Sequence, residues 1–184
     1  MLVKNVHSEM RNVDHETSDM QQSTTSKDAV KVEYGPTGKR LDYISWHQLH
    51  MYMARTLGEM STRGQRDGCY IVDQEHYHVA SGYSGENMSK NTNPDCAIMA
   101  ALRKLEKDRD YENCILYTTR FPCCDQCAEK ILELRIPRVW YWESINSEAK
   151  TERFNALKSN NVQCEKYIPS QSISIDFHNF KTKP

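Results

Sequence analysis

The sequence predicts a layered α/β fold preceded by a polar arm. In the second half of the chain, short apolar segments alternate with amphipathic segments of about ten residues, a pattern typical of neighbouring parallel strands joined by helices. The length of 184 residues suits one folded domain. Residues 1–36 are rich in polar side chains and lack both helical and strand periodicity, so we expect them to form a flexible arm.

Charge and hydropathy narrow the range of functions. The 24 basic and 25 acidic side chains leave a net charge of -1, so no global field attracts nucleic acid or an anionic membrane. Apolar runs are far shorter than the roughly 18 to 20 residues of a membrane span, and the N-terminus lacks a secretory core. We therefore expect a cytoplasmic or nuclear protein with neither a membrane nor a nucleic acid as its partner.

The first expected elements are a helix and a hairpin. Ser45 and Gln48 have the spacing of a helix capping box. Residues 69–72 and 77–80 predict two short strands around a polar turn. The apolar residues that follow the capping box lie on one helical stripe: Trp46, Leu49, Met53, Leu57 and Met60.

A second helix is expected after a long polar loop. Asn93 and Pro94 provide an N-cap and a first-turn proline, and apolar spacing continues the helix to Lys107. An extended segment at 173–177 closes the chain. The alternating elements between them are strand 114–117, helix 125–134, strand 139–142, helix 147–158 and strand 162–168.

Cysteines cluster at Cys123, Cys124 and Cys127, where a predicted strand gives way to a helix. The seven cysteines of a chain without an export signal are expected to be reduced thiols. A CxxC pair across the first turn of a helix can direct both sulfurs at one metal ion, and the helix N-terminus stabilises thiolates. Redox-active thiols and inert buried cysteines remain alternatives, because two sulfurs alone do not complete a zinc site.

The order of elements around this turn resembles that of the zinc-dependent nucleobase and nucleotide deaminases, whose signature is H-x-E followed by P-C-x-x-C. Motifs spread over residues 38–180 resemble the deoxycytidylate (dCMP) deaminase family in particular. These motifs lie at residues 39–46, 68–72, 82–85, 116–117, 121–122, 167–169 and 173–177.

This resemblance implies a three-layer α/β/α cytidine deaminase-like fold with a mixed five-stranded sheet, formed by residues 38–180. It also implies a zinc cofactor, hydrolysis of dCMP to dUMP in pyrimidine nucleotide metabolism, homohexameric assembly and control by deoxynucleoside triphosphates. In such enzymes the histidine of H-x-E and two cysteines hold zinc, while the glutamate transfers protons between water and the ring.

The sequence departs from the family at the positions that carry this chemistry. The register of the resemblance places Met99 at the ligating histidine and Ala101 at the catalytic glutamate. A thioether is a poor zinc ligand, and alanine cannot transfer a proton. Ser84 stands where the family has a substrate-contacting asparagine, and one extra residue separates Pro122 from the aligned CxxC pair.

These departures predict a catalytically inactive relative that acts as a regulatory or binding module. Its expected partners are deaminase-family subunits, in a homo- or hetero-oligomer, or deoxynucleotides. Zinc, where retained, is expected as a structural ion at Cys124 and Cys127, with Cys123 or Cys96 as further ligands. The alternative is a divergent active dCMP deaminase with a recruited base, for which Glu86 is a candidate.

Overall fold

The computed structural model describes residues 33–62, 64–86, 96–122, 124–143 and 145–170. The chain divides into two compact units, residues 1–42 and 43–184. In the first unit, Tyr34 and Arg40 form an antiparallel bridge around a turn in which Gly38 has a φ of 72°. Most of the expected arm, and the expected extended segment at 173–177, lie outside the described residues.

The second unit contains a mixed five-stranded sheet, as predicted, with the strand order β2-β1-β3-β4-β5. β1 pairs antiparallel with both β2 and β3, whereas β3, β4 and β5 run parallel to one another. Helices connect the parallel strands along the chain, as βαβ units require. The strands are β1 (Gly68–Val72), β2 (His78–Tyr83), β3 (Ile115–Thr118), β4 (Arg138–Tyr141) and β5 (Gln163–Lys166).

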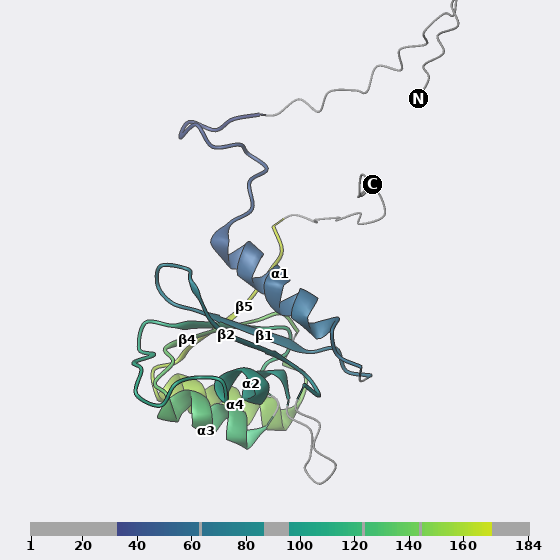
Figure 1. Ribbon diagram of the computed structural model, residues 1–184, viewed down its shortest axis with the longest axis vertical. Helices are drawn as coiled ribbons and strands as arrows, with labels where there is room; N and C mark the ends of the chain where they lie inside the picture. The colour runs from purple at the N-terminus through teal and green to yellow at the C-terminus, as the bar shows by residue number, and fades with distance from the viewer. Residues whose placement is uncertain (1–32, 63, 87–95, 123, 144, 171–184) are drawn as a thin grey trace, which may run out of the picture. The chain divides into compact units, whose positions relative to one another are not determined.

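Helices cover both faces of the sheet and complete the predicted three layers. Figure 1 shows α1 on one side and α2, α3 and α4 on the other. The sheet separates two apolar cores accordingly, because successive side chains of β3 point to opposite faces: Ile115 and Tyr117 toward α1, Leu116 toward the other helices. The helices are α1 (Trp46–Gly58), α2 (Ala97–Leu102), α3 (Asp125–Glu133) and α4 (Glu148–Ser159).

The second helix is shorter than its sequence pattern indicates. Asn93 and Pro94, the predicted start, lie outside the described residues, and α2 begins after an N-cap at Cys96. It ends at Leu102, before the expected Lys107, and beyond that end the Lys104 ammonium group donates a hydrogen bond to the Ser81 carbonyl of β2 at 2.7 Å. A Cβ added to Gly82 would lie 2.5 Å from the Ala101 amide nitrogen, so α2 rests directly on the β2 backbone.

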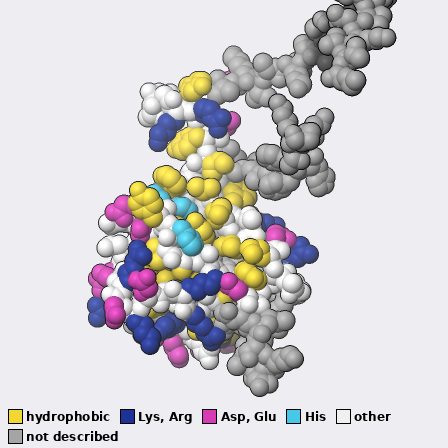
Figure 2. Space-filling model, viewed as in Figure 1, with side chains coloured by type: hydrophobic (Ala, Val, Ile, Leu, Met, Phe, Trp, Pro, Cys, Tyr) yellow, Lys and Arg dark blue, Asp and Glu magenta, His cyan; other side chains and the backbone are white. Residues whose placement is uncertain are grey.

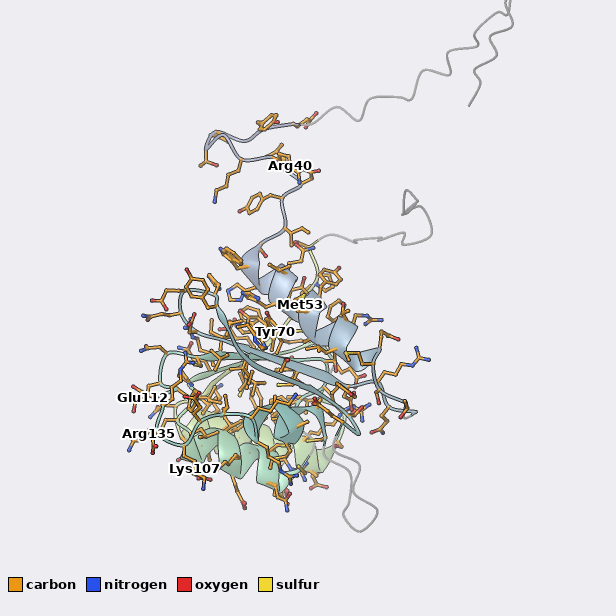
Figure 3. The ribbon with its side chains drawn as sticks, in the orientation of Figure 1. Arg40, Met53, Tyr70, Lys107, Glu112 and Arg135 are labelled. Atoms are coloured by element: carbon orange, nitrogen blue, oxygen red, sulfur yellow. The ribbon has the colours of Figure 1, made fainter. Side chains whose placement is uncertain are left out.

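α1 packs closely against the sheet at its small residues and leaves a stripe of large apolar side chains exposed. Ala54 and Gly58 are buried, and a Cβ added to Gly68 would lie 1.8 Å from the Ala54 carbonyl oxygen. This contact leaves no room for a side chain at Gly68. The exposed side of α1 carries the kind of apolar stripe that an amphipathic helix ordinarily buries. Figure 2 shows hydrophobic and histidine side chains gathered over this part of the molecule, and Figure 3 labels Met53 on α1.

Aromatic and histidine rings fill the rest of the space between α1 and the sheet. His50, only 2% exposed, shares a hydrogen bond with His76, with 3.2 Å between its Nε2 and the Nδ1 of His76. His50 also stacks on Tyr70, with 5.7 Å between ring centroids. Nearby, the Nδ1 of His47 and the hydroxyl of Tyr117 are hydrogen-bonded at 2.7 Å. The buried face of α1 is thus partly built from ionisable groups.

No helix within the described ranges combines the length and the apolar character needed to cross a bilayer.

Candidate metal centre

Three cysteine sulfurs meet where α2 and α3 begin. The Sγ of Cys127 lies 3.0 Å from the Sγ of Cys96 and 3.0 Å from the Sγ of Cys124. All three sulfurs lie within 4.8 Å of one another. Cys127 is fully buried and the other two are half-buried, so the cluster has one side toward the core and one toward its surface.

Local structure explains how the sulfurs are brought together. Cys124 is the N-cap of α3, and the amide of Cys127 donates to the Cys124 carbonyl at 3.1 Å. This first turn places residues i and i+3 on one side of the helix. Cys96 is the N-cap of α2, and Gly82 fixes that helix against β2. An ion pair of 2.7 Å between Asp125 and Arg153 links the same turn of α3 to α4.

The chemistry of this donor set fits a zinc ion. Thiolates are preferred zinc ligands, and Zn–S bonds of about 2.3 Å in a tetrahedral site put the sulfurs about 3.8 Å apart. The two contacts of 3.0 Å would therefore open by somewhat less than about 1 Å around the ion. Cys124 and Cys127 lie at the N-terminus of α3, where unpaired backbone amides and the helix dipole favour the binding of negatively charged groups. Three ligands come from the described residues, and Cys123 lies outside them.

The two positions expected to have lost the catalytic groups lie deeper along α2. Met99 is half-buried and packs against the larger core, and Ala101 is fully buried against Gly82. The side chain of this helix that reaches the cysteine pair belongs to Cys96, three residues before Met99. Ala97 and Ile98, which follow Cys96, are both buried, at 2% and 3% exposed.

Ser84, expected at a degenerate substrate position, is bound within the protein. Its hydroxyl oxygen lies 2.6 Å from the Gln65 carbonyl, to which it donates, and accepts from the Asp67 amide at 3.2 Å. The Ser61 hydroxyl in turn donates to the Ser84 carbonyl at 2.7 Å. These bonds tie the segment before β1 to the end of β2, so Ser84 has a structural role.

Cys69 of β1 is a buried thiol that sequence reasoning did not single out. Burial raises the pKa of Cys69 well above its ordinary value, and the neighbouring Cys96 adds to the shift. A raised pKa keeps this thiol protonated, and its sulfur is not part of the three-sulfur group. Cys69 is far from the other cysteines in the sequence, so no motif spacing links it to them. Only the fold brings its strand beside α2.

A charged groove of 320 Å³ lies beyond the ends of β3 and β4. Arg120 stands 3.3 Å from a carboxylate oxygen of Asp67 and 3.3 Å from one of Glu143. Arg55 stacks over the Trp142 ring at 5.2 Å, and Arg66 pairs with Glu59, the residue that follows α1. The arginines of this groove are thus matched by acids or an aromatic ring, and the groove offers little uncompensated charge to an anion.

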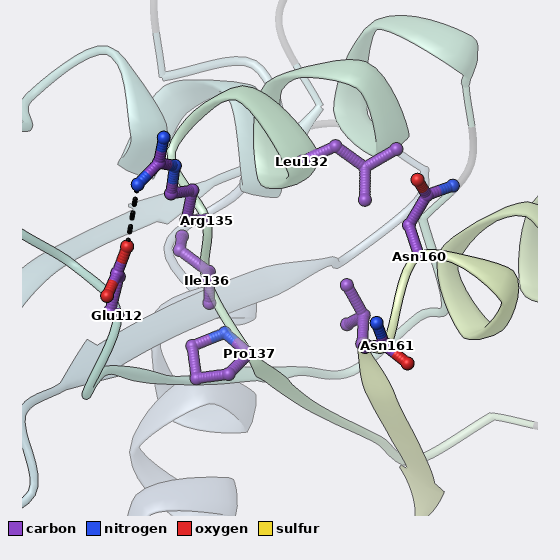
Figure 4. A pocket seen from close by; sticks show the side chains of 8 residues that line it. Glu112, Leu132, Arg135, Ile136, Pro137, Asn160 and Asn161 are labelled. Atoms are coloured by element: carbon purple, nitrogen blue, oxygen red, sulfur yellow. Dashed lines mark hydrogen bonds and ion pairs between the residues drawn. The ribbon is translucent and has the colours of Figure 1, made fainter.

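A second hollow of 530 Å³ lies between the ends of α3 and α4 (Figure 4). An ion pair of 2.9 Å between Arg135 and Glu112 borders it on one side and Asn160 on another. It adjoins Pro137 and Val162, which precede β4 and β5, whereas the cysteines follow β3. The hollow therefore lies at the opposite edge of the parallel strands from the metal centre.

The chain matches the family described as "Cytidine and deoxycytidylate deaminase zinc-binding region" over residues 44–143. An uncharacterized protein of Caenorhabditis elegans, F10E9.7, is 50% identical over 131 residues, which cover 70% of this chain and 100% of that protein. A probable deoxycytidylate deaminase of Drosophila melanogaster is 29% identical over 174 residues, covering 77% of this chain and 82% of the relative.

Solved structures show the same fold. The dCMP deaminase of cyanophage S-TIM5 in its apo form superposes with a TM-score of 0.55 at 21% identity, covering 66% of this chain and 96% of that one. The same phage enzyme in complex with dCMP and dUMP gives a TM-score of 0.55 at 21% identity, covering 65% and 94%. Together with the family match, which spans the hairpin, α2 and the cysteine turn, this shows that the chain belongs to the cytidine and deoxycytidylate deaminase family.

Proposed function

We propose that this protein is a dCMP deaminase-like protein without deaminase activity, in which zinc held by Cys96, Cys124 and Cys127 stabilises the fold. The observation that carries the proposal is the convergence of three sulfurs within 4.8 Å of one another, in a group that includes no carboxylate or imidazole from the described residues. Thiolates are preferred ligands of zinc, and no described residue beside them stands in for the proton-transferring glutamate of the family signature.

The position of Cys96 supports a register three residues earlier than the one expected from sequence. A Cys₃ set is a known variant of the His-Cys-Cys set of zinc deaminases, so Cys96 takes the ligand position of H-x-E. Two residues further on, the glutamate position then falls on Ile98, whose side chain is buried. In the other register the same position is Ala101. Either assignment puts an aliphatic side chain where the acid/base belongs.

Loss of this group removes the proton transfers of deamination. When bound, the zinc ion would polarise a water molecule, but the ring nitrogen must gain a proton and the leaving amine another. General acid/base groups are typically worth about 10² to 10⁴ in rate for each role, and one glutamate serves several roles. Ile98 and Ala101 can only exclude water and pack.

Glu86, the candidate replacement base, is held elsewhere. One carboxylate oxygen of Glu86 accepts a hydrogen bond from the Lys104 ammonium group at 2.5 Å. Lys104 follows the last turn of α2, whereas Cys96 precedes the first, and eight positions of helix separate two residues by about 12 Å. An ion-paired carboxylate at the far end of α2 does not reach a substrate held at the cysteines.

Zinc content and dCMP turnover test the proposal together. We expect about one zinc per chain in the wild-type protein, loss of zinc and a lower Tm in Cys127→Ser, and no dUMP from either protein after hours at high concentration. Cys164→Ser, which changes a half-buried cysteine of β5, is the matched control and should keep its zinc. Turnover by wild-type protein that disappears in Cys127→Ser would establish the alternative, an active deaminase.

A chain without turnover acts through what it binds. Its expected partners are deoxynucleotides or protein subunits. Titration calorimetry with dCMP, dCTP and dTTP at about millimolar concentration distinguishes these two classes, since this range detects even weak binding. Heat that saturates would identify a deoxynucleotide-binding module. Absence of heat with all three would leave association with protein subunits as the role of the fold.

A further inference from the structure

The exposed side of α1 carries a continuous apolar stripe, called here the α1 stripe. Trp46 is 55% exposed, Leu49 39%, Met53 40% and Met60 58%, and Leu57 among them is half-buried. Met60 follows the end of α1 by two residues, and on a helix continued to Met60 the spacing would put all five within about a quarter of the circumference. The stripe contains no charged residue.

Packing within the chain does not account for this surface. Among the described residues, no other helix covers this stripe: its opposite side is buried on the sheet through Met51 and Ala54, and α1 is the one described helix on that side (Figure 1). Contiguous exposed apolar surface marks contact sites, and tryptophan and methionine are enriched in protein–protein interfaces. Trp46 is also held in place by stacking on His76, with 4.7 Å between the rings.

The spacing of the α1 stripe is symmetric about Met53. Successive members are three, four, four and three residues apart along the chain. A two-fold interface requires a patch that complements itself, in which residue i contacts j and j contacts i. Two antiparallel α1 helices would place Met53 on the partner's Met53, Leu49 on the partner's Leu57, and Trp46 on the partner's Met60. Every apolar side chain then meets another, and the large indole meets a flexible thioether.

We propose that two copies of this chain associate through their α1 stripes, with the helices antiparallel and the two-fold axis at Met53. The inference does not depend on whether the chain deaminates dCMP, because the stripe lies on the opposite side of the sheet from α2 and α3. The stripe is about 20 Å long, and a single helix pair buries less than the roughly 800 Å² per partner of a standard interface. The association should therefore depend on concentration in the micromolar range.

Sedimentation equilibrium of the full chain tests whether two copies associate through the α1 stripe. We expect wild-type protein at about 100 µM to contain an even number of chains and to dissociate on dilution. Met53→Glu should halve the assembly at the same concentration, since two carboxylates would face each other across the axis. Asn155→Glu, which adds the same charge at an exposed position of α4, is the control and should sediment like the wild type. Matching thermal unfolding curves would show that both variants are folded.

A charge-pair rescue tests the orientation. Leu49→Glu alone should dissociate the assembly, and Leu49→Glu combined with Leu57→Lys should restore it, because each new carboxylate faces the partner's new ammonium group. The two positions are about 12 Å apart within one helix, so the pair cannot form inside a single chain. A monomeric wild type, or a folded Met53→Glu variant with unchanged mass, would overturn the proposal, and absence of rescue would overturn the antiparallel arrangement.

Discussion

Acid should weaken the packing of α1 on the sheet through His50. Burial, together with repulsion from the neighbouring His76 and His47, lowers the pKa of His50 to about 4. Its Nδ1 is buried without a hydrogen-bond partner among the described residues. The folded protein therefore holds this imidazole neutral, whereas the unfolded chain binds a proton near the ordinary pKa of about 6.5.

The sign and size of the effect follow from the two pKa values. A group whose folded pKa is lowered contributes its full stability above the unfolded pKa, and that contribution is lost as the pH falls from about 6.5 toward about 4. Between about pH 7.5 and pH 5 the loss comes to about 2 kcal/mol, since one pKa unit corresponds to about 1.4 kcal/mol. Burial also lowers the pKa of His47, which acts in the same direction.

Urea unfolding at the two pH values measures this term directly. His50→Phe keeps a flat ring against Tyr70 but cannot bind a proton, so its stability should fall by about 2 kcal/mol less than that of the wild type. Proton competition at the cysteine cluster affects both proteins equally and cancels in the comparison. An equal loss of stability in the two proteins would refute the reasoning.

Two further substitutions probe the backbone that positions the helices. Gly82→Ala should destabilise the fold by about 1 to 3 kcal/mol in urea unfolding, because its Cβ would collide with the backbone of α2, while Gly64→Ala, with nothing within 4 Å, serves as the neutral control. Arg135→Gly should stabilise the fold by about 0.5 kcal/mol in the same assay. Arg135 adopts a left-handed φ of 53° after α3, which glycine adopts without strain. The exposed ion pair with Glu112 that this change removes contributes less than the relief of that strain. A loss of stability in Arg135→Gly would show that the ion pair dominates.

Much of the fold could be predicted because local patterns and tertiary structure agree over most of it. The alternation from β3 to β5 is visible as short apolar segments between amphipathic ones, and the helix expected at 147–158 is α4, with Ser147 as its N-cap. α2 is the exception, since its contact with Gly82 of β2 and the Lys104 bond to Ser81 involve residues far apart in the chain.

The candidate site was predictable in part for the same reason. The spacing of Cys124 and Cys127 indicates a shared ligand site because both lie on one turn of helix. The contribution of Cys96 depends on where α2 begins. A cap at Asn93 would put Cys96 inside the first turn, whereas the structure makes Cys96 itself the cap, beside the other two thiols. The assignment of Met99 and Ala101 to the lost ligand and base remains a prediction.

The meeting of Cys96 with Cys124 joins two points that are 28 positions apart along the chain. An ion held by both would act as a cross-link that closes a loop containing β3. By the chain-entropy relation used for disulfides, closing a loop of this length restricts the unfolded ensemble by about 3 to 4 kcal/mol, a large share of the stability of a small domain. Zinc supply in the cell would then set how much of this protein is folded, and a chelator would act on it as a denaturant does.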